Sequence, residues 1–428
     1  MAALVLFLIL LVLIAVGMPI AISLGMSATI VILTYGTSTM LFQARSIVTA
    51  VNSYPLLAVP LFILAGDLMF TGGLSRRLIA FVDSLVGSMK ASLAHVTILA
   101  STFFAAISGS APATVAAIGT NMIPEMEKRG YSKEYSSALS AVSGMIGVMI
   151  PPSIPFIMYG ISAEQSVSTL FIAGIVPGIL FAIGFMITAY ILYKKNGFNA
   201  TSDKFNFGKM LKSFKEAIWA LIAPVIVLGG IYGGIFSPTE AAAVSVGYAL
   251  VVGMFIYKEM SFKDLFQTII KSSLTSGTVL ILVVFASTFG RLLTLEQVPV
   301  NLANFLTGFS SNPIVILLII NIFLLFVGMF METIASIIIL TPILLPVVTK
   351  LGVDPILFGV IMTVNLAIGF CTPPLGVNLF VASSISKLPI EKITKSVLPY
   401  FVVMIILLLL ITYVPAISLT LPRLMLSN

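Results

Sequence analysis

The stretch Gly144-Met-Ile-Gly-Val-Met-Ile-Pro-Pro-Ser-Ile-Pro155 is the strongest indication of the fold, because its Gly147 and Pro151-Pro152 recur 222 positions later in Leu366-Ala-Ile-Gly-Phe-Cys-Thr-Pro-Pro-Leu-Gly-Val377. Working outward, residues 124–177 correspond to residues 346–399. The same offset aligns Pro124 with Pro346, Gly130 with Gly352, Gly147 with Gly369, Pro151-Pro152 with Pro373-Pro374, and Pro177 with Pro399. In a strongly apolar chain, a duplicated pair of broken helices indicates a secondary transporter.

The composition indicates a membrane protein. Of 428 residues, 59% are hydrophobic and 9% are charged, whereas a soluble domain carries roughly 25% charged residues. Apolar runs recur along the chain, which predicts an all-α polytopic protein. The spans are expected near 2–17, 19–36, 55–71, 92–107, 134–150, 167–193, 217–236, 239–257, 272–293, 312–330, 355–371 and 393–414. No Lys or Arg precedes Arg45 and no clear cleavage site follows the first apolar run, so we expect a first membrane helix and not a signal peptide. Cys371 is the only cysteine and His95 the only histidine, which excludes an intramolecular disulfide and a His- or Cys-based metal cluster.

The chain divides into two halves at its one distinctly polar stretch, residues 194–215, which holds six lysines. The positive-inside rule places this linker in the cytoplasm. We therefore predict two structural repeats, 1–193 and 216–428, inverted relative to each other in the membrane. The amphipathic segments 74–87 and 295–308 lie either at the membrane interface as anchors or beside a mobile core as arms.

Two broken helices are predicted, at about 134–163 and 355–385. Proline has no N–H, so Pro151-Pro152 removes the helical donors for the carbonyls of Gly147 and Val148, and Pro373-Pro374 does the same for Gly369 and Phe370. A backbone carbonyl that faces lipid without a hydrogen-bond donor costs several kcal/mol, so breaks exposed to lipid are excluded. A simple kink healed by neighbouring helices remains the alternative. The duplication favours a cation site at each break.

Two re-entrant hairpins are predicted just before the breaks, at about 108–130 and 330–352. The first bends near Ser108-Gly-Ser-Ala-Pro-Ala-Thr114, and the second contains Met331-Glu-Thr333. A half-helix N-terminus at such a bend suits an anion, and hydroxyls beside freed carbonyls suit sodium. Close helix packing is the alternative reason for the small residues.

Glu332 is the ionisable residue that the sequence singles out, because a carboxylate inside the membrane is costly and usually functional. It can stabilise a bound cation, carry a proton, or form a structural ion pair. The other ionisable residues in or near the spans lie closer to predicted span ends: Asp67, His95, Glu240 and Arg291. Glu240 follows Ser237-Pro238, a pattern typical of a helix N-terminus.

The sequence carries no motif of an energy-coupling or hydrolytic enzyme. It contains no G-x-x-x-x-G-K-[ST], H-E-x-x-H or G-x-S-x-G pattern. We therefore expect a transporter, not an enzyme, driven by an ion gradient or by another subunit. The modest positive charge of +7 fits loop asymmetry in a membrane protein and gives no reason to expect nucleic acid as a partner.

Several motifs in order resemble the large membrane subunit of tripartite ATP-independent periplasmic (TRAP) transporters. They are Ser108-Gly-Ser-Ala-Pro-Ala-Thr114, Ile150-Pro-Pro-Ser153, Ser237-Pro-Thr-Glu240 and Thr372-Pro-Pro-Leu-Gly376. The resemblance covers essentially the whole chain. It implies an elevator-type transporter in the bacterial inner membrane that imports an organic anion with Na⁺ and an extracytoplasmic substrate-binding protein. It also implies a small four-helix membrane subunit, which we expect to be separate because this chain begins with the large-subunit pattern.

The resemblance also assigns residues to the expected sites. The sodium sites it implies combine hairpin and break residues: Ser108, Gly109, Ser110, Gly147, Val148 and Pro151 for the first, and Met331, Glu332, Thr333, Gly369, Thr372 and Pro374 for the second. The substrate is expected between the hairpin bends, near Ser110, Thr114, Ser153, Glu332, Thr333 and Asn365.

The substrate itself stays open at this stage. No Arg stands between the hairpins to bind a carboxylate with two parallel hydrogen bonds. Hydroxyls, amides and backbone N–H groups fit a sugar acid such as sialic acid, which we favour, as well as C4-dicarboxylates. Two rival interpretations are a stand-alone carboxylate or oxyanion carrier that needs no binding protein, and a structural subunit in which the breaks are only kinks.

Overall fold

The computed structural model describes residues 2–196, 205–310 and 312–426, and within these ranges the chain is built of helices joined by short connections. Part of the predicted linker, residues 197–204 with Lys204, lies outside the described residues. The first half contains α1 Ala2–Ala15, α2 Ile20–Tyr35, α3 Met40–Val51, η1 Tyr54–Leu57, α4 Ala58–Thr71, α5 Leu74–Val86, α6 Ser92–Ser108, α7 Ala111–Lys128, α8 Lys133–Gly144, η2 Met145–Val148, α9 Ile154–Ala163 and α10 Val167–Asn196. The second half contains α11 Phe207–Tyr232, α12 Pro238–Val251, η3 Val252–Ile256, α13 Phe262–Leu295, α14 Val298–Phe309, α15 Pro313–Phe330, α16 Thr333–Lys350, α17 Pro355–Gly369, α18 Val377–Ser386, α19 Ile390–Tyr413 and α20 Ala416–Leu426.

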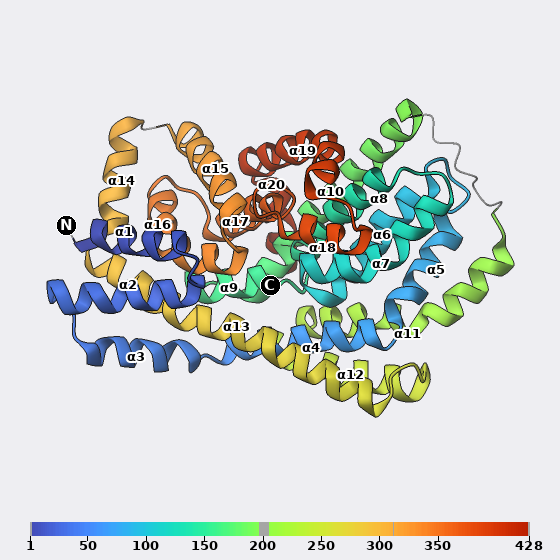
Figure 1. Cartoon of the computed structure of the whole chain (residues 1–428), viewed down its shortest axis with the longest axis horizontal. Coiled ribbons are helices and arrows are strands. Elements are labelled where there is room, and N and C mark those ends of the chain that lie inside the picture. The colour runs from blue at the N-terminus through green and yellow to red at the C-terminus, as the bar shows by residue number, and fades with distance from the viewer. Residues whose placement is uncertain (1, 197–204, 311, 427–428) are drawn as a thin grey trace.

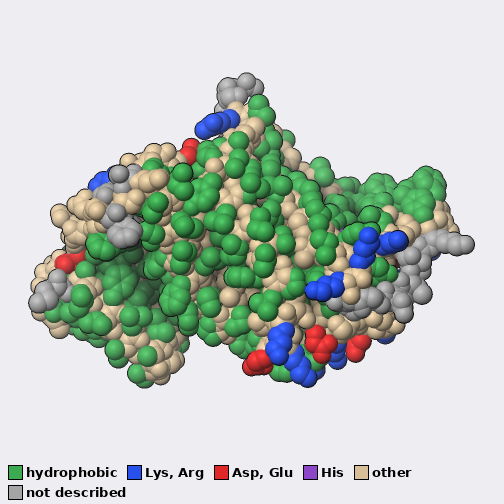
Figure 2. All heavy atoms as spheres, turned by 90° about the horizontal axis from the view of Figure 1, so that it is seen from above, with side chains coloured by type: hydrophobic (Ala, Val, Ile, Leu, Met, Phe, Trp, Pro, Cys, Tyr) green, Lys and Arg blue, Asp and Glu red, His purple; other side chains and the backbone are tan. Residues whose placement is uncertain are grey.

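Eight helices in the described ranges are long and apolar enough to cross a membrane. On the face seen in Figure 2, hydrophobic side chains cover most of the surface, and Lys and Arg gather mostly toward its lower right. The prediction of an all-α polytopic membrane protein is therefore confirmed.

Two helical hairpins and two broken helices form the interior. In Figure 1, α6 and α7 lie toward the right end of the molecule and α15 and α16 toward the left, with α9, α17 and α18 between them. The first hairpin turns between Ser108 and Ala111, and the second between Phe330 and Thr333. The breaks follow η2 and α17, and the Pro151-Pro152 and Pro373-Pro374 peptide bonds are both cis. The inverted relation of the two halves and their elevator movement stay predictions.

The structure gives the bounds of the segments that the sequence predicted. The broken helices span Lys133–Ala163 and Pro355–Ser386. The hairpin boundaries were wrong, because 108–130 and 330–352 cover only the bend and the second limb; α6 and α15, which we expected to be ordinary spans, form the first limbs. The amphipathic segments are the helices α5 and α14.

Capping decides where several helices begin. The Ser237 hydroxyl and the Glu240 carboxylate form a capping box at the start of α12, as expected for Glu240. Ser261 and Asp264 form another at the start of α13. This second box starts α13 ten residues earlier than the predicted span 272–293, and it places Lys271 inside the helix.

A tightly packed seam joins α4, α12 and α13, which run side by side along the lower part of Figure 1. Gly72 and Gly253 pack so closely that a Cβ at Gly72 would lie 2.9 Å from the Gly253 Cα atom. The carboxylate of Glu259 also bonds both Arg76 and Arg77 of α5, at 2.5 and 2.7 Å. These contacts tie the ends of four helices together.

Candidate substrate and cation site

The bend of the first hairpin lies directly against the first proline break. Gly109 adopts a left-handed conformation with φ 63°, which favours glycine. Its carbonyl accepts a hydrogen bond from the Ile154 N–H at 3.2 Å. A Cβ at Gly109 would lie only 2.7 Å from the carbonyl oxygen of Pro152. A glycine is therefore needed for this contact as well as for the turn.

Hydroxyls and carbonyls gather where this bend meets the break. The Ser108 and Thr114 hydroxyl oxygens lie 3.0 Å apart, and the Thr114 hydroxyl donates to the Ser110 carbonyl at 2.8 Å. A Cβ at Gly147 would lie 2.7 Å from that same carbonyl oxygen, so the break packs directly on it. The structure therefore brings together the residues predicted for the first sodium site, with Ser153 beside them.

The backbone carbonyls at the breaks are less free than the sequence suggested. The Ser153 hydroxyl donates to the Val148 carbonyl at 2.6 Å. The carbonyls of Gly369 and Phe370 accept from the N–H groups of Thr372 and Asn378, at 3.1 and 3.0 Å. Among the described residues, only the Gly147 carbonyl of the four has no donor. The chain after each break turns back and supplies a donor, which sequence spacing alone did not reveal. Each carbonyl keeps a second lone pair, so cation binding stays a prediction.

The bend of the second hairpin carries its own carboxylate. Glu332 caps α16, and its Oε2 accepts from the N–H groups of Ile334 and Ala335 at 2.8 and 3.1 Å. No ion pair involves Glu332 within the described ranges, so the structural ion pair that we considered is not observed. A negative charge at a helix N-terminus is favourable. When the Glu332 carboxylate is ionised, it repels a second anion from this N-terminus.

A cavity of about 270 Å³ lies beside this bend and the second break. Its lining includes Met331 and Glu332 of the bend, together with Gly369, Phe370, Leu375 and Gly376 around the break. The Leu375 N–H donates to the Met329 carbonyl at 3.1 Å, so this bend also docks on its break. Thr333 is buried, while the Thr372 hydroxyl bonds back to Ile368 and, like Pro374, does not line the cavity.

Asn365 has a structural environment. Its amide donates to the Asn321 side chain and to the Ile361 carbonyl, each at 2.8 Å, and Asn321 donates in turn to Thr412 at 3.1 Å. These bonds join α17, α15 and α19 within the buried core. The Asn365 Oδ1 has no hydrogen-bond partner among the described residues, and the predicted contact of Asn365 with substrate stays a prediction.

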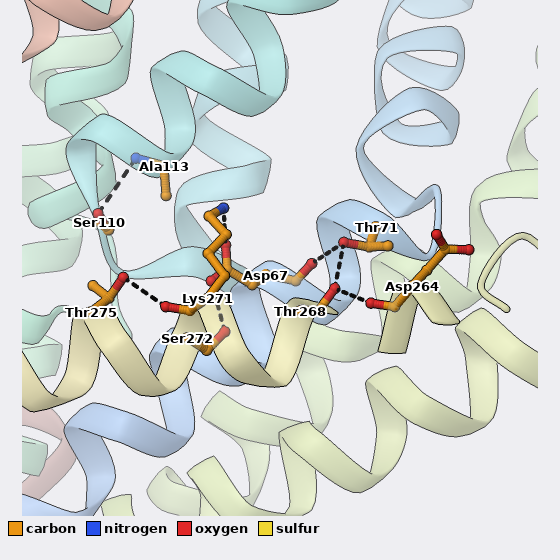
Figure 3. Close-up of polar contacts among 9 residues, drawn as sticks. All are labelled: Asp67, Thr71, Ser110, Ala113, Asp264, Thr268, Lys271, Ser272 and Thr275. Atoms are coloured by element: carbon orange, nitrogen blue, oxygen red, sulfur yellow. Dashed lines mark hydrogen bonds and ion pairs between the residues drawn. The ribbon is translucent and has the colours of Figure 1, made fainter. Parts of the chain in front are cut away.

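A second cavity of about 290 Å³ lies between the first hairpin bend and the seam of α4 and α13. Ser108, Ser110, Asp67, Lys271 and Thr275 provide its polar lining. Figure 3 shows Lys271 rising from α13 alongside Asp67 and below the bend that carries Ser110 and Ala113. The rest of the lining is apolar: Ile63, Phe70, Phe104, Pro112, Ala113, Ala116 and Ala117, with Gly66.

Sequence reasoning missed Lys271 and ranked Asp67 low. The apolar span was predicted to begin after Lys271, which placed the lysine in a loop. The signal that could have found it is the capping box Ser261-x-x-Asp264, since it starts the helix well before the lysine.

Comparison with known proteins identifies the family. The family model for the DctM component of the tripartite ATP-independent periplasmic transporter matches residues 7–417. The chain belongs to the DctM family. It is accordingly a multi-pass protein of the bacterial inner membrane.

Three DctM relatives show the breadth of the family. The isethionate TRAP transporter permease DctMQ of Oleidesulfovibrio alaskensis is 49% identical over 93% of this chain. This chain spans only 63% of that relative's length. The C4-dicarboxylate large permease DctM of Pseudomonas aeruginosa is 41% identical over 99% of both chains. The sialic acid large permease SiaM of Vibrio cholerae is 38% identical over 96% of both.

A solved structure shares the fold. The YdaH transporter of Alcanivorax borkumensis superposes with a TM-score of 0.66 at 14% identity, covering 89% of this chain and 86% of that one. At this identity the likeness concerns the fold alone.

Proposed function

We propose that this DctM chain is the translocation subunit of a sodium-coupled importer of organic anions. The observation that carries the proposal is the docking of each hairpin bend on a proline break, through the Gly109–Ile154 and Met329–Leu375 backbone bonds. Sodium prefers several oxygen ligands. The cluster of Ser108, Thr114 and the Gly147 carbonyl offers them at the first break.

The two bends have different roles in this proposal. The first presents hydroxyls and no acidic side chain of its own, whereas the second is already capped by Glu332. The imported anion therefore binds at the first bend, and the carboxylate of Glu332 helps to neutralise a cation near the second. This revises our expectation that the anion lies between both bends.

The hairpins and breaks move together as an elevator against the scaffold helices in the proposed cycle. The scaffold supplies a fixed wall, because α4, α12 and α13 are joined along the packed seam. The lysines at the end of α10 and the start of α11 face the cytoplasm by the positive-inside rule.

The proposed complex contains two further proteins. One is a small four-helix membrane subunit, and the other is a periplasmic binding protein that delivers the anion. The relatives are named for an isethionate, a C4-dicarboxylate and a sialic acid permease, so all three cargoes belong in a test.

The deciding experiment is uptake into proteoliposomes that contain this chain and its small subunit. Labelled isethionate, succinate and sialic acid are offered with and without binding protein, under an inward Na⁺ gradient or equal choline. The proposal predicts uptake of one cargo that requires both sodium and binding protein. Sodium-driven uptake without binding protein would favour a stand-alone carrier, and no uptake by a folded complex would reject the transporter role.

A further inference from the structure

Lys271 occupies an unusual position for a lysine. It lies nine residues after the first residue of α13, or about 14 Å along the helix, within a helix that is apolar enough to span a membrane. Its side chain is nevertheless 69% exposed, because it lines the cavity beneath the first hairpin bend. An ionisable residue that belongs to a membrane-spanning helix and lines a cavity is a candidate for a binding role.

The partner of Lys271 is held in place independently of the lysine. Asp67 of α4 is 17% exposed, and its Oδ1 accepts from the Lys271 ammonium at 3.0 Å. Its other oxygen, Oδ2, accepts from the Ser272 hydroxyl at 2.8 Å. Further along the same seam, the hydroxyls of Thr71 and Thr268 lie 3.3 Å apart. Figure 3 shows this contact beside Asp67. Asp67 therefore stays fixed when the flexible lysine side chain turns away.

The opposite wall of the cavity supplies hydroxyls. Ser108 and Ser110 of the first bend line it, while Thr275 lies on the same wall as Lys271, one turn further along α13. The Ser110 hydroxyl is engaged only weakly by the Ala113 N–H, at 3.5 Å. The Thr275 hydroxyl already donates to the Lys271 carbonyl at 3.1 Å, and the Ser108 hydroxyl is paired with that of Thr114. An anionic group in the cavity therefore meets one ammonium group and the Ser110 hydroxyl as a free donor.

We propose that Lys271 binds the anionic group of the transported molecule, and that Asp67 competes for the same ammonium. This inference rests on the proposed function and names the residue that recognises the negative charge of the cargo. When the anion enters, Lys271 turns from Asp67 toward it; when the anion leaves, Asp67 takes the ammonium back and prevents rebinding. A long, flexible point charge suits this exchange of partners.

The same pair selects for a cargo with one negative charge. Lys271 is the only cation in the described lining, and Asp67 already offsets it. A second anionic group would meet apolar walls such as Phe70 and Phe104, where an unpaired charge is strongly disfavoured. The expected cargo is therefore a small organic monoanion, a sulfonate or a monocarboxylate, and not a dicarboxylate.

The test is equilibrium binding of labelled isethionate, sialic acid and succinate to the purified complex of this chain and its small subunit, in NaCl and without binding protein. A charge-assisted hydrogen bond of this kind predicts that Lys271→Met weakens binding of the monoanion about 10- to 100-fold. Lys271→Arg keeps the charge and should retain most of the affinity. Lys263→Met, an exposed lysine on the same helix, is the matched control and should bind like the wild type.

Asp67→Asn provides the second, opposite readout. Removing the competing carboxylate should tighten monoanion binding, lower the maximal uptake rate because release slows, and improve succinate binding relative to isethionate. Thermal unfolding of each variant shows whether it is folded. Because Asp67→Asn is expected to gain affinity, a folding defect cannot imitate the result.

The outcomes separate this inference from the proposed function. If the wild type takes up a cargo with sodium and binding protein, but Lys271→Met binds that cargo as well as Lys263→Met does, the role of Lys271 is overturned. A preference of the wild type for succinate would overturn the charge selection. If the wild type takes up none of the three cargoes, the proposed function fails and this inference fails with it.

Discussion

Replacing Gly109 by alanine tests the contact between the first hairpin bend and its break. The substitution has two costs. The left-handed backbone of Gly109, with φ 63°, disfavours alanine by about 1–2 kcal/mol. The new Cβ would also lie 2.7 Å from the Pro152 carbonyl oxygen, an overlap with backbone that typically costs about 1–3 kcal/mol.

Gly130 supplies the matched control. It is also left-handed, with φ 88°, but a Cβ there meets no atom within 4 Å. Gly130→Ala therefore carries the backbone strain alone. The difference between the two variants isolates the docking contact and amounts to about 1–3 kcal/mol, or about 5- to 150-fold in any binding that needs the docked bend.

The assay is thermal unfolding of the purified complex across a series of NaCl concentrations, with choline chloride holding ionic strength constant. If the bend and the break together form a sodium site, Gly109→Ala should raise the half-saturating sodium concentration by that factor relative to Gly130→Ala. Equal sodium dependence in the two variants would refute the reasoning, because it would mean that binding does not require the close approach of Gly109 to Pro152.

Three further predictions use the same complex. Glu332→Ala leaves the Ile334 and Ala335 N–H groups without their cap and should cost about 0.5–2 kcal/mol of stability by denaturant or thermal unfolding, so an unchanged transition would contradict the capping role. Asn365→Ala should lower the melting temperature, because it removes a buried hydrogen-bond partner of Asn321 worth about 1–3 kcal/mol. The relative affinities for the three cargoes should stay unchanged. An altered cargo preference would support Asn365 as a substrate ligand. Lys209→Cys should react in right-side-out vesicles only with membrane-permeant thiol reagents, because the positive-inside rule places this position in the cytoplasm. The native Cys371 is buried and should contribute little labelling of its own. Rapid labelling by an impermeant reagent would reverse the assigned orientation.

The breaks and bends were the part of the fold that sequence predicts best. Proline and glycine impose backbone geometry locally, so the paired Pro-Pro motifs located both broken helices to within a residue or two. Hydropathy was less reliable for helices with a polar face. It missed α3, which contains Gln43 and Arg45, and it started α13 ten residues late.

The candidate site was predictable only where neighbouring residues in sequence are also neighbours in space. The cluster of Ser108, Ser110 and Thr114 lies within one hairpin turn, and its small polar residues identified it. The pair of Asp67 and Lys271 joins two helices 204 positions apart, and nothing in the local pattern indicates that they meet. Hydrogen-bond donors for the break carbonyls were hidden for the same reason, since they come from the chain that folds back after each break.

The cavity beneath the first bend has one wall whose residues are tied into the helix packing and one wall whose residues can be substituted with little effect on that packing. Asp67 and Lys271 stand on the seam where α4 is fastened to its neighbours, and changes there would disturb several helices at once. The facing wall on α7 consists of small residues, Ala113, Ala116 and Ala117, whose substitution would reshape the space without touching that frame. Diversification of cargo among chains of this architecture would then proceed by enlarging or trimming this alanine surface. An engineer who wishes to change the cargo should begin on the same surface.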